Sequence, residues 1–226
     1  MQDVAAALQA VQARIRSAEE RFGRAPGSVA LLAVTKTRPP EDLRAAFAAG
    51  QRAFGENYVS EALGKMGALE DLAIEWHFIG PVQSNKTRPI AERFAWVHSV
   101  DREKVARRLA EQRPAGLPPL QVCLEVNVSG EEGKSGVAPG ERPALARTVV
   151  GLPRLRLRGL MAVPAPGEDF ELQRQAFRSL RELFEGLRAE GLPLDTLSMG
   201  MSGDLEAAVA EGSTLVRVGT AIFGPR

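Results

Sequence analysis

The sequence predicts an α/β fold, namely a single-domain (β/α)8 TIM barrel with an extra N-terminal helix. Eight short apolar runs alternate with stretches of helical spacing, which favours right-handed βαβ units around a parallel sheet. Eight units in about 200 residues fit a small barrel, whereas a doubly wound sheet usually has fewer strands. No Gly-, Ser- or Pro-rich linker divides the chain. We therefore expect residues 1–226 to form one barrel domain, with residues 1–25 as the helix leading into it.

The predicted elements follow one another in a regular order. Val4, Leu8, Val11 and Ile15 recur at helical spacing and predict the N-terminal helix, which the segment GRAPGS at 23–28 ends. The predicted strands are the apolar runs at 28–35, 52–56, 74–80, 95–100, 119–128, 155–163, 194–200 and 213–219. The predicted barrel helices lie at 39–50, 57–69, 84–94, 101–112, 139–151, 168–191 and 203–212. Each of the first seven strands is thus followed by a helix.

The composition argues against several classes of protein. Lys and Arg number 29 against 28 Asp and Glu, so the formal charge of +1 gives no long-range attraction to a nucleic acid. With 44% hydrophobic and 25% charged residues, the chain can bury a sizeable core. Its apolar runs are too short to cross a bilayer, and its first residues lack the basic segment and long apolar core of a signal peptide. We therefore expect a cytoplasmic protein that binds neither nucleic acid nor membrane.

Cysteine and histidine are scarce. Cys123 is the only cysteine, which excludes an intramolecular disulfide, and its apolar neighbours predict a buried strand position. His77 and His98 have no cysteine or carboxylate at ligand spacing. We therefore expect no metal site.

Candidate site residues gather at the ends of the predicted strands. In a barrel, the carboxyl ends of the strands and the loops after them carry the functional residues. Seven of the eight strand ends have such candidates. They are Lys36, Glu56 with Asn57, His77 with residues 83–85, Asn127, Met161, residues 198–202 and residues 217–220.

Lys36 is the candidate with the most specific chemistry. It ends an apolar strand, where burial of the cation lowers the pKa of the amine and leaves a neutral nucleophile that can form a Schiff base. Alternatively, Lys36 extends into the loop and pairs with Glu41 or Asp42.

The segments SMGMSGD at 198–204 and RVGT at 217–220 predict a phosphate site. They occupy the loops after the seventh and eighth strands, where barrels frequently bind phosphate. Ser202 and Thr220 supply hydroxyls, Arg217 supplies a charged donor, and Gly219 allows close approach of the backbone. In the alternative reading, Ser202 or Asp204 simply caps the following helix. An amine and a phosphate site across one barrel mouth suit a phosphorylated aldehyde such as pyridoxal 5′-phosphate (PLP).

Six segments, in order, carry a resemblance to a known family. They are AVTKTRP, FGENYVSE, WHFIGPVQSNKTR, VNVSGEEGKSG, GLMAVP and SMGMSGDLEAAVAEGSTLVRVGTAIFG. From about residue 29 onward the chain resembles the pyridoxal phosphate homeostasis proteins, also called the proline synthase co-transcribed protein family. The resemblance implies a PLP-binding barrel like the N-terminal domain of alanine racemase.

The resemblance also implies roles for single residues. Lys36 carries PLP as a Schiff base. The phosphate is held by Ser202, Arg217, Gly219 and Thr220, and the ring is lined by Asn57, Ser198 and Met199. No residue is assigned a catalytic role, and the group that faces the pyridine nitrogen stays open.

The expected function is PLP homeostasis, in which the chain buffers PLP or delivers it to PLP-dependent apoenzymes. The resemblance implies binding without established turnover, and we expect a monomer or a weak dimer. A racemase of this fold uses a tyrosine from an additional β domain as its second acid or base. The alternative is a small PLP-dependent, racemase-like enzyme that uses Tyr58, His77 or a bound water in that role.

Overall fold

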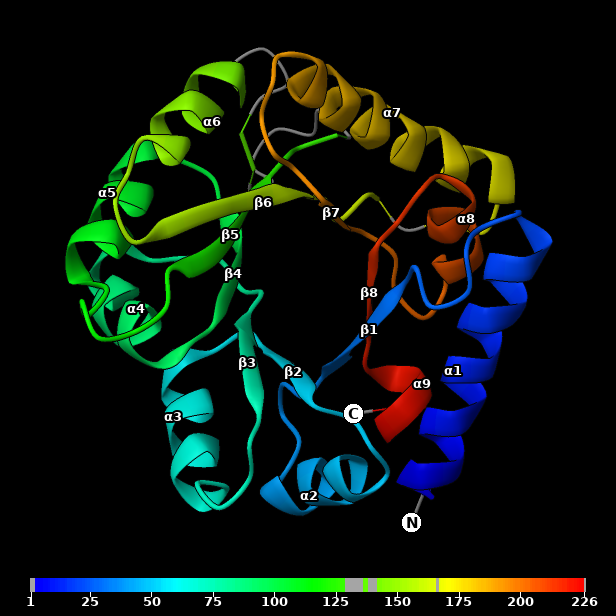
Figure 1. Cartoon of the computed structure of the whole chain (residues 1–226). Coiled ribbons are helices and arrows are strands. Elements are labelled where there is room, and N and C mark those ends of the chain that lie inside the picture. Colours follow the sequence, from blue (N-terminus) through cyan, green and yellow to red (C-terminus); the bar gives the residue numbers. More distant parts are fainter. Residues whose placement is uncertain (1–2, 129–135, 138–141, 166, 226) are drawn as a thin grey trace.

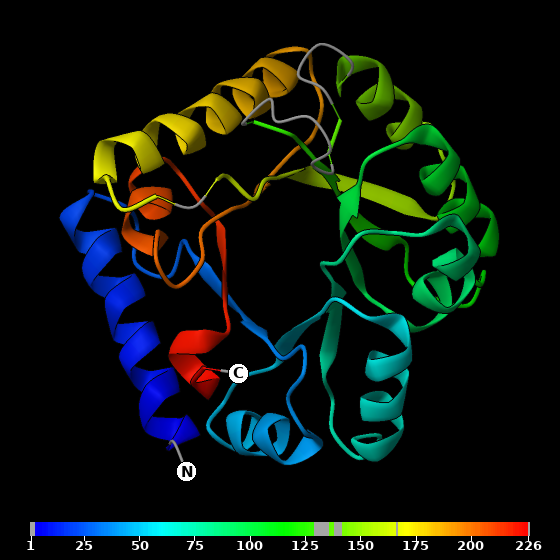
Figure 2. The same cartoon turned by 180° about the vertical axis from the view of Figure 1, so that it is seen from behind.

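The eight apolar runs form the strands of a closed barrel. The computed structural model describes residues 3–128, 136–137, 142–165 and 167–225. Within these ranges, eight parallel strands pair in chain order from β1 to β8, and β8 pairs with β1 to close the barrel. Helices surround the strands in both views (Figures 1 and 2). The predicted (β/α)8 barrel with an N-terminal helix is therefore confirmed.

Except for the short helix α9, the observed elements lie within or close to the predicted ranges. The strands are β1 (Ala30–Val34), β2 (Ala53–Glu56), β3 (Glu75–Phe78), β4 (Trp96–Val100), β5 (Leu120–Glu125), β6 (Leu155–Met161), β7 (Thr196–Ser198) and β8 (Leu215–Val218). The helices are α1 (Val4–Arg21), α2 (Pro40–Ala48), α3 (Val59–Ala68), α4 (Thr87–Arg93), α5 (Glu103–Gln112), α6 (Arg142–Val150), α7 (Phe170–Ala189), α8 (Leu205–Ala210) and α9 (Thr220–Phe223). A 3-10 turn, η1 (Ser84–Lys86), precedes α4. Most of the segment VNVSGEEGKSG, including Lys134, lies outside the described residues.

Helix α1 covers the side of the barrel where the chain begins and ends. Asp3 caps it by accepting a hydrogen bond from Ala6 N, and Leu8, Val11 and Ile15 bury its apolar face. The helix packs against α2, α8 and α9 (Figure 1). The apolar spacing in the sequence therefore marks a helix that seals the join between β8 and β1.

Most residues of the strands are buried, as expected for parallel strands under a ring of helices. Cys123 lies fully buried in β5, as predicted, and burial raises the pKa of its thiol to about 12. No helix in the described ranges is both long and apolar enough to cross a membrane. In the same part of the chain, no three His, Cys, Asp or Glu side chains are grouped as metal ligands.

Candidate functional site

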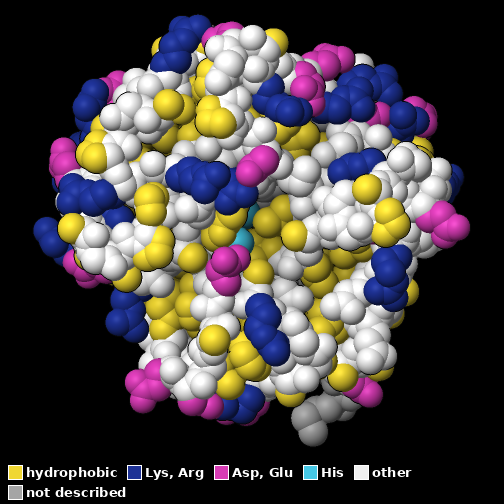
Figure 3. All heavy atoms as spheres, in the orientation of Figure 1, with side chains coloured by type: hydrophobic (Ala, Val, Ile, Leu, Met, Phe, Trp, Pro, Cys, Tyr) yellow, Lys and Arg dark blue, Asp and Glu magenta, His cyan; other side chains and the backbone are white. Residues whose placement is uncertain are grey.

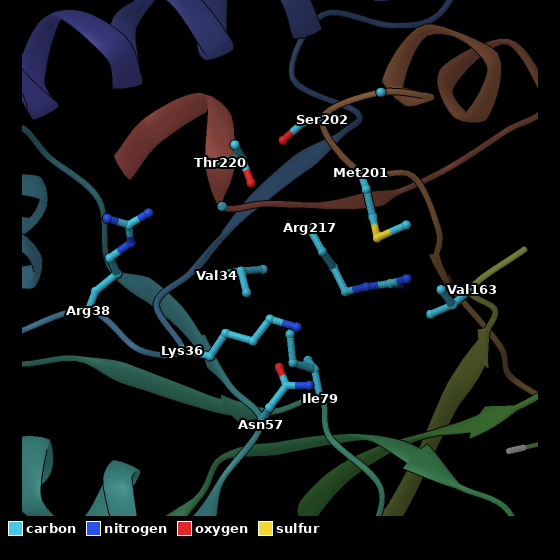
Figure 4. A pocket seen from close by; sticks show the side chains of 12 residues that line it. Val34, Lys36, Arg38, Asn57, Ile79, Val163, Met201, Ser202, Arg217 and Thr220 are labelled. Atoms are coloured by element: carbon cyan, nitrogen blue, oxygen red, sulfur yellow. The ribbon is translucent and has the colours of Figure 1, made fainter. Parts of the chain in front are cut away.

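A pocket of about 380 Å³ opens at the carboxyl ends of the strands (Figure 4). Its twelve lining residues come from β1, β8 and the segments that follow β1, β2, β3, β6, β7 and β8. The charged residues among them are Lys36, Arg38 and Arg217, all of which are basic. Because no acidic residue among the described residues lines the pocket, the pocket favours an anionic ligand.

The structure brings six of the eight predicted site residues together. The lining includes Lys36, Asn57, Ser202, Arg217, Gly219 and Thr220. Ser198 and Met199 are fully buried and are not among the lining residues. Ser198 instead lies against Arg217, and Met199 packs in the hydrophobic core. Ser198 and Met199 therefore lie behind the pocket lining, Ser198 in contact with the lining residue Arg217.

Four of the lining residues were not candidates in the sequence. Arg38 follows Lys36 by two positions, and its Nη2 donates to the carbonyl oxygen of Pro225 at 3.0 Å. Met201 and Gly203, by contrast, lie inside the segment SMGMSGD, which the sequence marked as part of the phosphate site, and both line the pocket. The other three are Val34, Ile79 and Val163, apolar residues at strand ends. Nothing in the sequence separates such residues from the core.

The turn that carries Lys36 has an unusual backbone. Thr37 has a φ of 63°, which a β-branched residue rarely adopts. Its N–H donates to Oε1 of Glu61 at 2.5 Å, and the N–H of Arg38 donates to the carbonyl of Thr35 at 3.0 Å. Hydrogen bonds on both sides of Lys36 thus hold the turn.

Lys65 connects the two sides of this turn. The side chain is 5% exposed, and its Nζ donates to the carbonyl of Thr35 at 2.6 Å, to Glu61 at 2.5 Å and to Glu56 at 2.8 Å. Burial raises the pKa of Glu56, and the hydrogen bonds from Lys65 and Thr35 oppose that rise. The buried amine therefore fixes the backbone from which Lys36 enters the pocket.

Replacing Lys65 by methionine is expected to lower the free energy of unfolding by about 3–5 kcal/mol, because it leaves the buried Glu56 carboxylate without its cation. Urea denaturation measures the loss. Lys104→Met, on the exposed face of α5, is the matched control and is expected to change stability little. Equal stability of the two variants would show that Lys65 does not hold this turn.

Arg217 crosses the pocket from β8. Its guanidinium donates to the carbonyl of Ser198 at 2.6 Å, to Ser198 Oγ at 2.8 Å and to the carbonyl of Ala162 at 2.9 Å. Burial lowers its pKa to about 10, so the group stays charged at neutral pH. Figure 4 shows the guanidinium pointing away from the hydroxyls of Ser202 and Thr220. The charge of Arg217 therefore lies apart from the hydroxyl end of the pocket.

The hydroxyls of Ser202 and Thr220 face the same part of the pocket (Figure 4). Thr220 begins the short helix α9, in which the N–H groups of Ile222 and Phe223 donate to the carbonyl of Gly219. A Cβ at Gly219 would lie 3.1 Å from the carbonyl oxygen of Val34, so glycine lets β8 pass close to β1 here. Two hydroxyl donors make this end suitable for an anion.

The segment SMGMSGD does not cap helix α8 through a side chain. Asp204 precedes α8, but its side chain makes no cap hydrogen bond. It accepts instead from the N–H of Met201 at 2.5 Å. The carboxylate therefore shapes the loop that carries Ser202 rather than the start of the helix.

Asn57 offers the pocket an acceptor. Its Oδ1 is buried and has no hydrogen-bond partner among the described residues. An unsatisfied buried acceptor costs about 1–3 kcal/mol, which a donor on a ligand would recover.

The other polar residues considered from the sequence lie outside this pocket. His77 is buried in the barrel and bonds to Glu75 and His98, as a core histidine would. Tyr58 is 56% exposed and lines a neighbouring cavity of about 250 Å³ with Lys86.

Comparison with known proteins places the chain in a family. The sequence model of the family described as "Alanine racemase, N-terminal domain" matches residues 6–226. The pyridoxal phosphate homeostasis protein of Pseudomonas aeruginosa is 62% identical over 226 residues, which span 100% of this chain and 97% of that protein. The chain belongs to the pyridoxal phosphate homeostasis protein family. The resemblance found in the sequence is thereby confirmed.

Solved structures agree with this membership. The structure of PipY from Synechococcus elongatus with PLP bound is 38% identical, with a TM-score of 0.82, and the match covers 93% of this chain and 100% of PipY. Alanine racemase from Corynebacterium glutamicum is 18% identical, with a TM-score of 0.70, and the match covers 97% of this chain and 61% of the racemase. The second likeness shows that this homeostasis-family chain shares the racemase barrel fold.

Proposed function

We propose that this chain binds PLP in the pocket at the carboxyl ends of the strands and serves PLP homeostasis by holding and releasing the cofactor. One observation carries the proposal: a lysine amine, a pair of hydroxyls and a buried arginine line a single pocket, and no acidic residue in the described part of the chain lines it with them. The names of the relatives and the PLP-bound structure of PipY support it.

The residues present fit PLP. The cofactor supplies an aldehyde, which links covalently to a primary amine. Lys36 provides the amine of the pocket, and Ser202 and Thr220 provide hydroxyls at the end suited to a phosphate. Asn57 offers its unpartnered acceptor to a donor on the cofactor. Each polar group of PLP thus has a counterpart among the lining residues.

We assign Arg217 to the ring end of the cofactor rather than to the phosphate, which revises the role that the resemblance implied. Its guanidinium points away from the two hydroxyls and is held by Ser198 and Ala162. With a pKa of about 10 the group remains a charged donor, so a ring nitrogen beside it accepts a hydrogen bond and takes up no proton.

The phosphate end is tested by comparing PLP with pyridoxal, which lacks the phosphate. Thr220→Val is expected to weaken PLP binding roughly tenfold and leave pyridoxal binding unchanged, because it removes only a hydroxyl donor to the phosphate. Absorbance titration measures both affinities. Ser179→Ala, on the outer helix α7, is the control. An equal loss for both ligands would place the phosphate elsewhere.

The racemase-like alternative makes a different prediction. Tyr58 and His77, the second bases considered from the sequence, do not line the pocket in the described part of the chain. Rapid, Lys36-dependent exchange of the α-proton of amino acids with deuterated solvent would favour the enzyme, and its absence in the PLP-loaded protein favours the carrier. Transfer to PLP-dependent apoenzymes, a monomeric or weakly dimeric state and a cytoplasmic location stay predictions.

A further inference from the structure

A chain of hydrogen bonds runs through the inside of the barrel. Oε1 of Glu75 lies 2.8 Å from Nε2 of His77, and Nδ1 of His77 lies 2.9 Å from Nε2 of His98. Nδ1 of His98 lies 2.8 Å from Oγ of Ser198, which accepts from Arg217 at 2.8 Å. We call these five residues the relay.

The relay connects opposite mouths of the barrel. Glu75 is the first residue of β3, and its side chain is 52% exposed. His77, His98 and Ser198 are at most 1% exposed, and Arg217 lines the pocket at the carboxyl ends of the strands. Figure 3 shows histidine atoms at the base of a central hollow, beside acidic and basic side chains. A solvent-accessible carboxylate is therefore bonded, through buried groups, to a cation of the cofactor pocket.

The chemistry of the two ends fixes the direction of the relay. Arginine only donates, so Ser198 Oγ accepts from Arg217 and directs its own proton to Nδ1 of His98. His98 then carries its proton on Nε2 and donates to His77, which donates from Nε2 to the ionised Glu75. Every donor has an acceptor, and both rings are neutral.

The surroundings of the relay agree with neutral rings. Burial lowers the pKa of His77 and lowers that of His98 well below its ordinary value. The hydrogen bond from His77 lowers the pKa of Glu75, so Glu75 is ionised at neutral pH. The charged or titratable groups that face the relay are Arg158 near Glu75, and Cys123, Glu125 and Asp204 near Arg217. The stacked ring of Trp96, 5.3 Å from that of His77, fixes the plane of the imidazole.

We propose that Glu75 is a positioning residue for Arg217, acting through His77, His98 and Ser198 from the far mouth of the barrel. The ionised carboxylate accepts the last proton of the relay and so keeps a lone pair of Ser198 directed at the guanidinium. The effect of Glu75 on PLP affinity rests on the proposed function, whereas the positioning of Arg217 by Glu75 does not depend on it.

Glu75→Gln tests the proposal in the protein without cofactor. Glutamine keeps the size of Glu75 but can donate or accept, so it no longer fixes the direction of the relay. In ¹⁵N NMR spectra of the wild type, His98 is expected to carry its proton on Nε2 alone. In Glu75→Gln both neutral tautomers of His98 are expected, with shifted Arg217 guanidinium signals. Glu92→Gln, which removes a carboxylate lining the same cavity as Glu75, is the control and is expected to leave both unchanged.

A double-mutant cycle separates positioning from general destabilisation. Ser198→Ala cuts the relay next to Arg217, so Glu75→Gln added to Ser198→Ala is expected to shift the Arg217 signals no further. Equal effects of Glu75→Gln in both backgrounds would overturn the proposal. A single unchanged tautomer of His98 in Glu75→Gln would overturn it as well.

The second arm measures PLP affinity. Glu75→Gln is expected to weaken PLP binding roughly two- to tenfold relative to the Glu92→Gln control. An unchanged PLP affinity together with shifted Arg217 signals would overturn the predicted effect of Glu75 on PLP binding. Failure of the wild type to bind PLP would instead overturn the proposed function, while the NMR arm still decides whether Glu75 positions Arg217.

Discussion

Lys36→Ala is expected to abolish covalent retention of PLP and to weaken its binding on the order of 100-fold. The variant keeps the hydroxyls of Ser202 and Thr220 and the charge of Arg217, so residual reversible binding is expected. The loss follows from the chemistry, because arginine and the hydroxyls cannot replace a primary amine toward an aldehyde. Equilibrium dialysis against PLP measures the affinity, and the absorbance of the dialysed protein reports covalent retention.

Lys104→Ala is the matched control for this prediction. It removes an exposed lysine of α5, far from the pocket lining, and is expected to retain PLP as the wild type does. Retention of bound PLP by Lys36→Ala at the wild-type level would contradict the assignment of Lys36.

Gly80→Ala is expected to lower the free energy of unfolding by about 1–3 kcal/mol and to weaken PLP binding. A Cβ at this position would lie 2.2 Å from the carbonyl oxygen of Asn57 and 2.8 Å from its Cα. Because these are backbone atoms, the segment that carries Asn57 must move, and Oδ1 of Asn57 moves with it. Urea denaturation measures the first effect and PLP titration the second.

The control for this variant lies in a nearby helix. A Cβ at Gly64, inside α3, would meet nothing within 4 Å, so Gly64→Ala is expected to stabilise the protein by about 0.5–1 kcal/mol with no change in PLP affinity. Gly80→Ala with wild-type stability and affinity would show that the close approach of Gly80 to Asn57 does not shape the pocket.

The barrel was predictable because its signals are local. Each apolar run and each helical stretch is read from a few neighbouring residues, and the right-handed rule for βαβ units supplies the topology. The short helix α9 was not predicted, because TAIFGPR is too brief to show a helical period. Its first turn nevertheless supplies part of the hydroxyl end of the pocket.

The site was predictable where one residue type is required by chemistry. A lysine at a strand end indicates Schiff-base chemistry, and Gly, Ser and Thr residues in the last two loops indicate a phosphate site. These residues do line one pocket. Ser198, at the end of β7, and Met199, directly after it, are both fully buried and do not line the pocket, whereas Met201 does. Burial at a strand end depends on barrel geometry that the sequence does not display.

The relay could not be predicted from the sequence because its contacts also depend on the geometry of the barrel. His77 and His98 lie on neighbouring strands, but Ser198 is 100 residues away from His98 along the chain. Only closure of the barrel brings Ser198 between His98 and Arg217. The donor directions follow once these contacts are known, and they give a remote residue such as Glu75 a role in the pocket.

The most direct test of the account is to locate the covalent bond. Wild-type protein incubated with PLP is reduced with borohydride, digested and mapped by mass spectrometry. We expect a reduced adduct on the peptide that contains Lys36 and none on the peptides that contain Lys65, Lys86 or Lys104. An adduct confined to another lysine, or no adduct at all, would contradict it.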